Sequence, residues 1–293
     1  MQAQLASKSE NLKKLMSELG SVLVAYSGGV DSSLLLKVAV SVLGDRALAV
    51  IADSPTYPRS ELGEAIELAR LIGANCMVIE TDELSDSRFS GNPPERCYYC
   101  KLELFGKLRL IAHEKGIEWV ADGSNSDDVG DYRPGSRAAR ELGVVSPLKD
   151  AGLTKSEVRE LARIAGLPNW SKPAQACLAS RLPYGTRITR HELERVAAAE
   201  ESLRRQGFSQ VRVRVHGDVA RVEVLPEELD KLLSSGVRAL VVVQLKKLGF
   251  LFVSIDLEGY RTGSMNELID RAGVRAGVSI QSGGQRQEPR GDV

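Results

Sequence analysis

Short apolar segments alternate with amphipathic segments along the first 185 residues of the chain. Four apolar runs have the length of buried strands and cover residues 22–25, 47–52, 76–79 and 119–121. Before and between them, apolar positions recur every three or four residues, which predicts helices over 4–19, 34–39, 59–72 and 102–115. Strands that alternate with helices in this way predict a doubly wound α/β fold with a parallel sheet, which we assign to residues 1–185.

The pattern changes after Gly185. Residues 211–215 and 220–224 alternate strictly between apolar and polar positions, which predicts an antiparallel hairpin with one apolar face. Together with an apolar strand at 250–256, this hairpin predicts a smaller α+β domain at residues 186–275 for substrate binding or oligomerisation. Residues 276–293 are polar and rich in glycine, and we expect this tail to be disordered.

The first strand leads into a glycine-rich turn, and a helical pattern follows directly. Glycines let the backbone approach an anion closely, and the free N–H groups of a new helix attract negative charge. The turn lacks the GxxxxGK[ST] and GxGxxG patterns, and it resembles the SGGxDS signature of the PP-loop ATP pyrophosphatases. An ordinary strand-to-helix turn is the alternative. The residues predicted to bind ATP here are Ser27, Gly28, Gly29, Asp31 and Ser32.

Two other polar positions follow strands of the same predicted sheet. Because ligands bind beyond the carboxyl ends of parallel strands, the sheet would bring these positions to the phosphate loop. Gly123 and Asn125 lie in a polar loop after the strand at 119–121, and a solvated turn is the alternative there. Asp53 either contacts the adenosine or a magnesium ion, or it forms the turn before Pro55.

The composition is that of an ordinary globular protein, and its charge balance limits the kinds of binding partner that we expect. Lys plus Arg and Asp plus Glu both number 39, so a net charge of zero opposes a dedicated nucleic-acid binder. The sequence has neither an apolar run of membrane-spanning length nor a signal-peptide core at its start, and we expect a cytoplasmic protein without membrane contact. Four cysteines in such a chain indicate reactive or metal-binding thiols rather than disulfides.

Three of the cysteines are candidates for chemistry. Cys97 and Cys100 form one CxxC, and Cys177 lies in a loop rich in proline, while Cys76 reads as a small buried hydrophobe. A CxxC alone is also compatible with a redox pair, half of a zinc site, or chance. Three thiolates suit a [4Fe–4S] cluster with one open iron, or a reactive thiol with two helpers. Arg181 is placed to lower the pKa of Cys177.

The polar face of the predicted hairpin carries two arginines. Arg212 and Arg214 share one face of their strand, and Glu223 lies at a matching position on the facing strand. Such charges commonly form a solvated edge. If this face instead covers the cleft of the α/β domain, the two arginines would clamp a phosphate or a carboxylate.

From about residue 5 to residue 275, the chain resembles the LarE family of ATP-dependent sulfur transferases, which make the nickel-pincer nucleotide cofactor. The matching segments are 27–32 (SGGVDS), 95–101 (ERCYYCK), 122–125 (DGSN) with 131–135 (DYRPG), 176–181 (ACLASR) and 256–261 (DLEGYR). The resemblance implies that the enzyme uses ATP, bound with Mg²⁺, to adenylate the carboxylates of pyridinium-3,5-biscarboxylic acid mononucleotide. A sulfur nucleophile would then displace AMP.

The resemblance also implies roles for individual residues. Asp31 and Cys177 would be catalytic. In one version of the family a cysteine matching Cys177 gives up its own sulfur, and in the other three cysteines hold an iron–sulfur cluster. Because this chain has Cys97, Cys100 and Cys177, we favour the [4Fe–4S] version, with a sulfide donor as partner and a homo-oligomer as the assembly. The implied substrate-binding residues are Ser180, Arg181, Arg212, Arg214 and Glu223.

Three other functions fit parts of the pattern. A PP-loop enzyme that thiolates tRNA also combines this loop with cysteines, although zero net charge argues against it. A ligase that makes GMP or NAD would use ammonia and has no need of three cysteines. A non-catalytic nucleotide or redox sensor would use the CxxC as a switch and would release no pyrophosphate.

Overall fold

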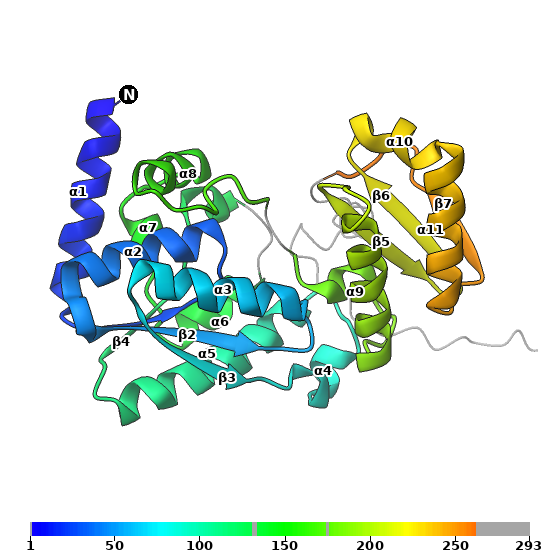
Figure 1. Cartoon of the computed structure of the whole chain (residues 1–293). Helices are drawn as coiled ribbons and strands as arrows, with labels where there is room; N and C mark the ends of the chain where they lie inside the picture. The colour runs from blue at the N-terminus through cyan, green and yellow to red at the C-terminus, as the bar shows by residue number, and fades with distance from the viewer. Residues whose placement is uncertain (1, 131–133, 174–175, 262–293) are drawn as a thin grey trace, which may run out of the picture. The chain divides into compact units, whose positions relative to one another are not determined.

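The computed structural model describes residues 2–130, 134–173 and 176–261 (Figure 1). The predicted tail at 276–293, the end of the predicted second domain and part of the 131–135 motif lie outside these ranges. The proposed domain boundary at residue 185 stays a prediction. Within the described ranges, no helix is long and apolar enough to cross a membrane.

A four-stranded parallel sheet forms the centre of the first half, as the alternating pattern predicts. Its strands lie in the order β3-β2-β1-β4, so the chain runs from β1 toward one edge and then returns to the other side of β1. The strands are β1 (Val22–Ala25), β2 (Ala47–Asp53), β3 (Asn75–Glu80) and β4 (Trp119–Ala121). The reversal between β1 and β4 is where α/β sheets of this kind bind ligands, beyond the carboxyl ends of the strands.

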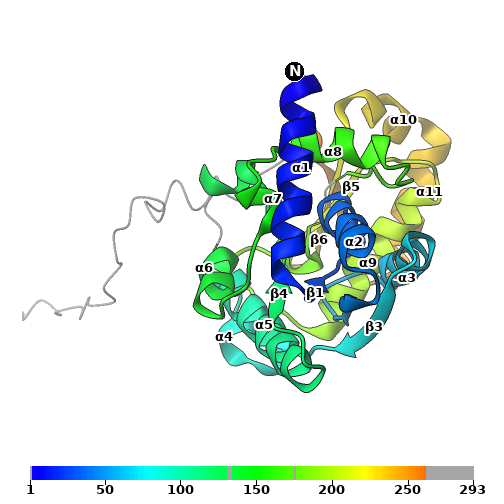
Figure 2. The ribbon, with the colours of Figure 1, turned by 90° about the vertical axis from the view of Figure 1, so that its left-hand side faces the viewer.

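Helices cover both faces of this sheet because alternate strand residues point to opposite sides (Figures 1 and 2). On β1, Val22 and Val24 belong to one apolar core, while Leu23 belongs to the other. The first core is covered by α1 (Gln2–Leu19), α2 (Val30–Leu43), α3 (Arg59–Ile72), α7 (Pro147–Asp150) and α8 (Lys155–Ile164). The second is covered by α5 (Arg96–Glu114) and α6 (Pro134–Glu141).

A second, three-stranded sheet follows in the chain. Strands β5 (Val211–His216) and β6 (Val219–Val224) form the predicted antiparallel hairpin, and β7 (Phe252–Ile255) pairs with β6 in parallel. The apolar side of the hairpin, with Val213 and Val222, packs in a core with Leu203 and Phe250. The helices of this part are α9 (Arg190–Arg204), α10 (Leu229–Leu233) and α11 (Ser235–Lys247).

The remaining elements are short and lie mainly in the connections. They are α4 (Ser87–Ser90) and the 3₁₀ turns η1 (Gly44–Arg46), η2 (Glu83–Ser85), η3 (Ser126–Gly130), η4 (Leu178–Arg181) and η5 (Pro226–Glu228).

One expectation about the cysteines and one helix boundary need correction. Cys76 is exposed rather than buried, because β3 is an edge strand and four of its six residues are exposed. The helix predicted to start near residue 102 begins at Arg96, so Cys97 and Cys100 lie one turn apart in the first turns of α5. Side chains at this helical spacing share a face of the helix.

Candidate active site

The glycine-rich turn joins β1 to α2 and leaves the start of α2 open. Gly28 has φ +72°, and an added Cβ would lie 2.7 Å from the Cβ of Ala65, so both the backbone conformation and the close packing require glycine. Gly29 is the N-cap of α2, and no side chain caps the helix there. The first N–H groups of this 14-residue helix are therefore placed for an anion.

The loop after β4 packs directly against this turn. A Cβ added to Gly123 would lie 2.9 Å from the backbone nitrogen of Ser32, so the two loops touch at a residue without a side chain. The Nδ2 of Asn125 donates to Oδ1 of Asp31 at 3.1 Å. The sheet thus brings the two predicted loops into contact.

Lys155 is a polar residue of this site that the sequence reasoning missed. Its ammonium group forms an ion pair with Oδ2 of Asp31. Thr154 caps α8 through a capping box with Glu157, and Lys155 follows as the first residue of that helix. A lysine in the first turn opposes the helix dipole, which favours negative charge at this end. That mismatch was the available signal that Lys155 serves the site rather than the helix.

A cavity of about 1250 Å³ opens where these loops meet, which is ample for a nucleotide. Gly28 does not line this cavity, because it lies on the other side of the loop and packs against α3. Asp53, at the end of β2, faces the cavity, and so does Lys155. The predicted ATP-binding residues that line it are Ser27, Gly29, Asp31, Ser32, Asp53, Gly123 and Asn125.

The three candidate cysteines gather near one edge of this site. Cys97 lines the cavity, and all three thiols are free. Cys100 and Cys177 come from two distant segments and pack against the same apolar core. Burial raises the pKa of Cys100 most, and the nearby Cys177 and Cys97 raise it further. Within the described ranges, no three His, Cys, Asp or Glu side chains converge closely enough to share a single metal ion.

The expected effect of Arg181 on Cys177 is wrong. Burial raises the pKa of Cys177 above its ordinary value of 9.0, and the cation that partly offsets this is Arg96. The guanidinium of Arg181 instead donates to the backbone carbonyls of Ala176 at 2.6 Å and Cys177 at 3.0 Å. Arg181 therefore fixes the backbone around Cys177, and its charge is directed to another partner.

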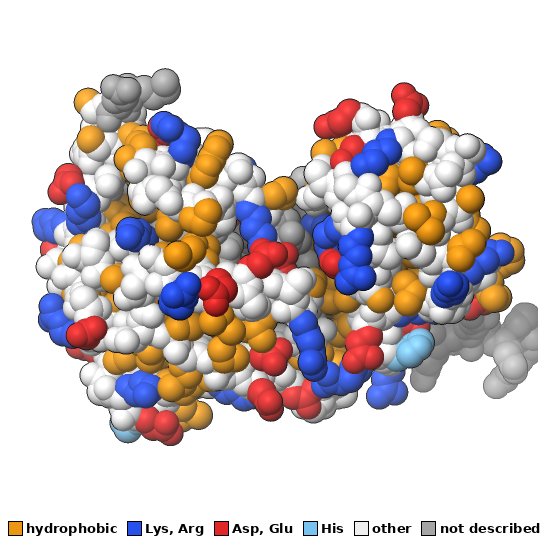
Figure 3. Space-filling view, viewed as in Figure 1, with side chains coloured by type: hydrophobic (Ala, Val, Ile, Leu, Met, Phe, Trp, Pro, Cys, Tyr) orange, Lys and Arg blue, Asp and Glu red, His pale blue; other side chains and the backbone are white. Residues whose placement is uncertain are grey.

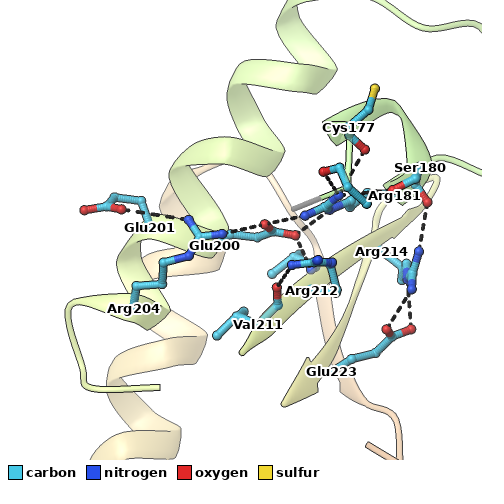
Figure 4. Close-up of polar contacts among 12 residues, drawn as sticks. Cys177, Ser180, Arg181, Glu200, Glu201, Arg204, Val211, Arg212, Arg214 and Glu223 are labelled. Atoms are coloured by element: carbon cyan, nitrogen blue, oxygen red, sulfur yellow. Dashed lines mark hydrogen bonds and ion pairs between the residues drawn. The ribbon is translucent and has the colours of Figure 1, made fainter. Parts of the chain in front are cut away.

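That partner is a buried carboxylate on α9 (Figure 4). The Nε and Nη2 of Arg181 donate to the two oxygens of Glu200 at 2.7 and 2.9 Å, and both side chains are at most 1% exposed. Glu200 also accepts from Arg204 at 3.0 Å and from the backbone nitrogen of Val213 at 3.1 Å. This bidentate pair joins the cysteine loop to α9 and β5.

The polar face of the hairpin is buried, and the solvated-edge alternative is wrong. Arg212 and Arg214 are 3% and 6% exposed. The Nε and Nη2 of Arg214 donate to Glu223 at 2.9 Å, and its Nη1 donates to the carbonyl of Ser180 at 2.8 Å (Figure 4). Burial and the charge of Arg181 lower the pKa of Arg212 to about 10. The predicted substrate-binding residues thus form one connected cluster beside Cys177.

Comparison with known proteins gives relatives along nearly the whole chain. Residues 5–96 match the NAD synthase family. An uncharacterized protein of Synechocystis sp. is 45% identical over 91% of this chain and 100% of its own length. The pyridinium-3,5-bisthiocarboxylic acid mononucleotide synthase of Lactiplantibacillus plantarum is 42% identical over 92% of this chain and 98% of its own length. An uncharacterized protein of Methanocaldococcus jannaschii is 31% identical over 82% of this chain and 91% of its own length.

Proposed function

The chain belongs to the LarE family of PP-loop enzymes, and from this premise we propose that it is an ATP-dependent sulfur transferase acting on pyridinium-3,5-biscarboxylic acid mononucleotide. One observation carries the proposal: Asp31 of the phosphate loop and Cys97, one of the three candidate cysteines, line the same cavity. Water readily hydrolyses an acyl adenylate. The site that activates the carboxylate must therefore lie close to the sulfur nucleophile.

In the first step, a carboxylate oxygen of the substrate attacks the α-phosphorus of Mg·ATP and pyrophosphate leaves. The uncapped amides at the start of α2 would face the phosphates, and Asp31 and Asp53 are the carboxylates that would hold the magnesium ion of Mg·ATP. Lys155 supplies a positive charge beside Asp31, where it can stabilise the departing pyrophosphate. The product is an acyl adenylate.

The donor set at the second step suits an iron–sulfur cluster. A cluster spreads its thiolate ligands over several irons, so they do not have to converge on one atom. Cys97, Cys100 and Cys177 would hold it as three ligands that leave one iron open. When bound, a [4Fe–4S] cluster would present sulfide taken from a sulfide donor as the nucleophile, so that AMP would leave and a thiocarboxylate would remain. Sacrifice of the Cys177 sulfur is the alternative source.

The arginine cluster would bind the anionic groups of the substrate. Arg212 and Arg214 are buried close to the Cys177 loop, where low dielectric strengthens their interaction with a phosphate or a carboxylate. Arg181 and Glu223 are held by buried partners and would set the position of the neighbouring groups. Ser180 connects the loop to Arg214 through its carbonyl oxygen.

The proposal is tested with anaerobically purified or reconstituted protein. We expect iron, inorganic sulfide and a broad visible absorbance, and we expect AMP, pyrophosphate and a thiocarboxylate when Mg·ATP and the biscarboxylate nucleotide are added. Separate Cys97→Ala, Cys100→Ala and Cys177→Ala variants should lose the absorbance, whereas Cys76→Ala, at an exposed cysteine, should keep it.

Three results would contradict parts of this proposal. Absence of pyrophosphate release with the biscarboxylate nucleotide would overturn the function. An iron-free, colourless protein that still transfers sulfur, with conversion of Cys177 to dehydroalanine, would assign the sulfur to the cysteine itself. A salt-dependent complex with tRNA, with thiolated tRNA as product, would favour tRNA thiolation instead.

A further inference from the structure

Asn92 has an unusual backbone conformation for a residue with a side chain. Among the residues that the structure describes, it is the one position other than glycine with a positive φ, +55°. It lies between α4 and α5, four residues before α5 begins, and it is fully buried. Glycine adopts the left-handed conformation freely, whereas asparagine only tolerates it. The backbone alone would favour glycine here, so the buried amide needs a further explanation.

The side chain of Asn92 joins two distant stretches of the chain. Its Nδ2 donates to the backbone carbonyls of Leu182 at 3.3 Å and Pro183 at 2.8 Å. Its Oδ1 accepts from the Nη1 of Arg96 at 3.0 Å. A guanidinium only donates and a carbonyl only accepts, so the amide fits these partners in one orientation. The same guanidinium lies over the ring of Tyr184, 4.8 Å from its centroid.

Backbone hydrogen bonds hold the same two stretches together. The carbonyl of Asn92 accepts from the nitrogen of Gly185 at 2.9 Å, and the carbonyl of Ser90 accepts from the nitrogen of Ile188 at 2.8 Å. Side-chain and backbone contacts therefore surround Asn92 on both sides. A contact with this many buried hydrogen bonds resists separation, because each broken bond would leave a buried polar group unpaired.

Each stretch leads within a few residues to a candidate cysteine. Arg96 is the first residue of α5, so Cys97 follows it directly. On the other side, Leu182 follows η4, the short turn that begins after Cys177. The nitrogen of Ser180 closes that turn on the carbonyl of Cys177 at 2.9 Å. A fixed contact between the two stretches therefore limits how far the thiols of α5 can move from the thiol of the loop.

We propose that Asn92 is a positioning residue that sets the separation between the CxxC of α5 and Cys177, so that the three thiols are ready to bind one iron–sulfur cluster. Cys100 and Cys177 pack against the same apolar core, which is the arrangement that this contact would maintain. The inference rests on the proposed function. The competing explanation is that Asn92 only supplies the left-handed conformation of its turn, and glycine would then replace it without loss.

The first test measures the separation of two thiols in the cluster-free protein. A Cys76→Ala/Cys97→Ala background keeps two cysteines, Cys100 and Cys177. Dibromobimane becomes fluorescent when it links two thiols, and we expect it to link this pair readily. Labelling of each cysteine with monobromobimane, followed by peptide mass spectrometry, corrects for any change in the reactivity of a single thiol.

Two changes at Asn92 are compared in this background. Asn92→Gly suits the backbone conformation but lacks the amide, and Asn92→Asp keeps the size but places an acceptor against two carbonyls. Both should slow the cross-linking about tenfold or more, as expected for a residue that orients ligands of a metal site. The same two changes at Asn75, an exposed residue of β3, are the matched controls and should leave the rate unchanged.

The second test measures cluster binding in the protein with all four cysteines. After anaerobic reconstitution at limiting iron, Asn92→Gly and Asn92→Asp should hold about tenfold less iron and inorganic sulfide than the parent. First-turnover pyrophosphate release and the KM for ATP should stay at the parent's values, because Asn92 does not line the ATP cavity. Urea denaturation checks that both variants are folded under these conditions.

Several outcomes would overturn the role of Asn92. They are parent-like cross-linking in both variants, a parent-like iron content in Asn92→Gly, an equal loss of pyrophosphate release, and an absence of cross-linking in the background itself. If the parent holds no iron or forms no thiocarboxylate, the proposed function or its cluster version is wrong. The cross-linking rates still decide in that case whether Asn92 sets the separation of the thiols.

Discussion

Asn125 donates a hydrogen bond to Asp31 at 3.1 Å, although the two residues are 94 positions apart in the chain. One follows β4 and the other lies in the first turn of α2, so the contact depends on the pairing of β1 with β4. Lys155 pairs with the second oxygen of the same carboxylate. Asp31 is thus held in place from two sides before any ligand binds, which is the preorganisation that a phosphate-transfer site requires.

Lys155→Met should leave the fold intact and slow first-turnover pyrophosphate release about 100-fold, because the variant removes the cation beside the leaving group. Rapid-quench measurement of pyrophosphate checks this. Lys115→Met is the matched control, since Lys115 is exposed at the end of α5, and it should react at the parent's rate. Equal rates for Lys155→Met and the parent would show that this ammonium group serves only the ion pair with Asp31.

Asp31→Asn should raise the Mg²⁺ concentration needed for half-maximal pyrophosphate release about tenfold or more, because a neutral amide is a weaker ligand for a hard cation. The measurement is a magnesium titration at saturating ATP. Asp45→Asn, at an exposed residue of η1, is the control and should leave the titration unchanged. A titration for Asp31→Asn that coincides with the parent's would remove Asp31 from the magnesium site.

The sheet and the phosphate loop were predictable because they depend on local patterns. Apolar runs, helical periodicity and the glycine turn are written within short windows of sequence, and parallel strands place their carboxyl ends together. Lys155 was missed because it becomes informative only through Asp31, a partner far away in the chain. The capping box explains the sequence around Lys155 as the start of a helix, which obscures the role of Lys155 in the site.

The burial of the arginines could not be predicted from the sequence either. Alternation in β5 correctly separates Val213 from Arg212 and Arg214, but it does not tell whether the polar face meets solvent or protein. The partners that make burial possible are Glu200 on α9 and Glu223 on β6, and only the tertiary structure brings them together. The prediction for Cys76 was wrong in the opposite direction. This residue was expected to be buried, but its apolar strand lies at the edge of the sheet and its side chain is exposed.

Gly123→Ala should slow first-turnover pyrophosphate release about 10- to 100-fold, because the added methyl group forces the β4 loop away from Ser32. The expected loss of unfolding free energy is about 1–3 kcal/mol. Gly63→Ala is the control: this exposed position in α3 has nothing within 4 Å, and the change should add about 0.5–1 kcal/mol of stability. Urea denaturation and rapid quench measure both quantities, and parent-like kinetics in Gly123→Ala would contradict the close contact.

Glu200→Gln should lower the unfolding free energy at pH 7 by about 3–5 kcal/mol, because it leaves the buried guanidinium of Arg181 without its counter-charge. Burial alone would raise the pKa of Glu200, but Arg181, Arg212 and Arg204 outweigh this and lower it below 4.5. A lowered pKa in the folded state gives stability that is complete above pH 4.5 and is lost as the pH falls through the folded value.

The difference between the parent and Glu200→Gln should therefore be constant from pH 8 to pH 5 and shrink as the pH falls below about 4.5, where the parent's carboxylate takes up its proton. Urea denaturation at a series of pH values measures it. Glu160→Gln, on the exposed pair with Arg163, should follow the parent at every pH because solvent screens that pair. A deficit for Glu200→Gln that stays unchanged down to pH 3 would mean that the lost hydrogen-bond acceptor, and not the lost charge, destabilises the variant.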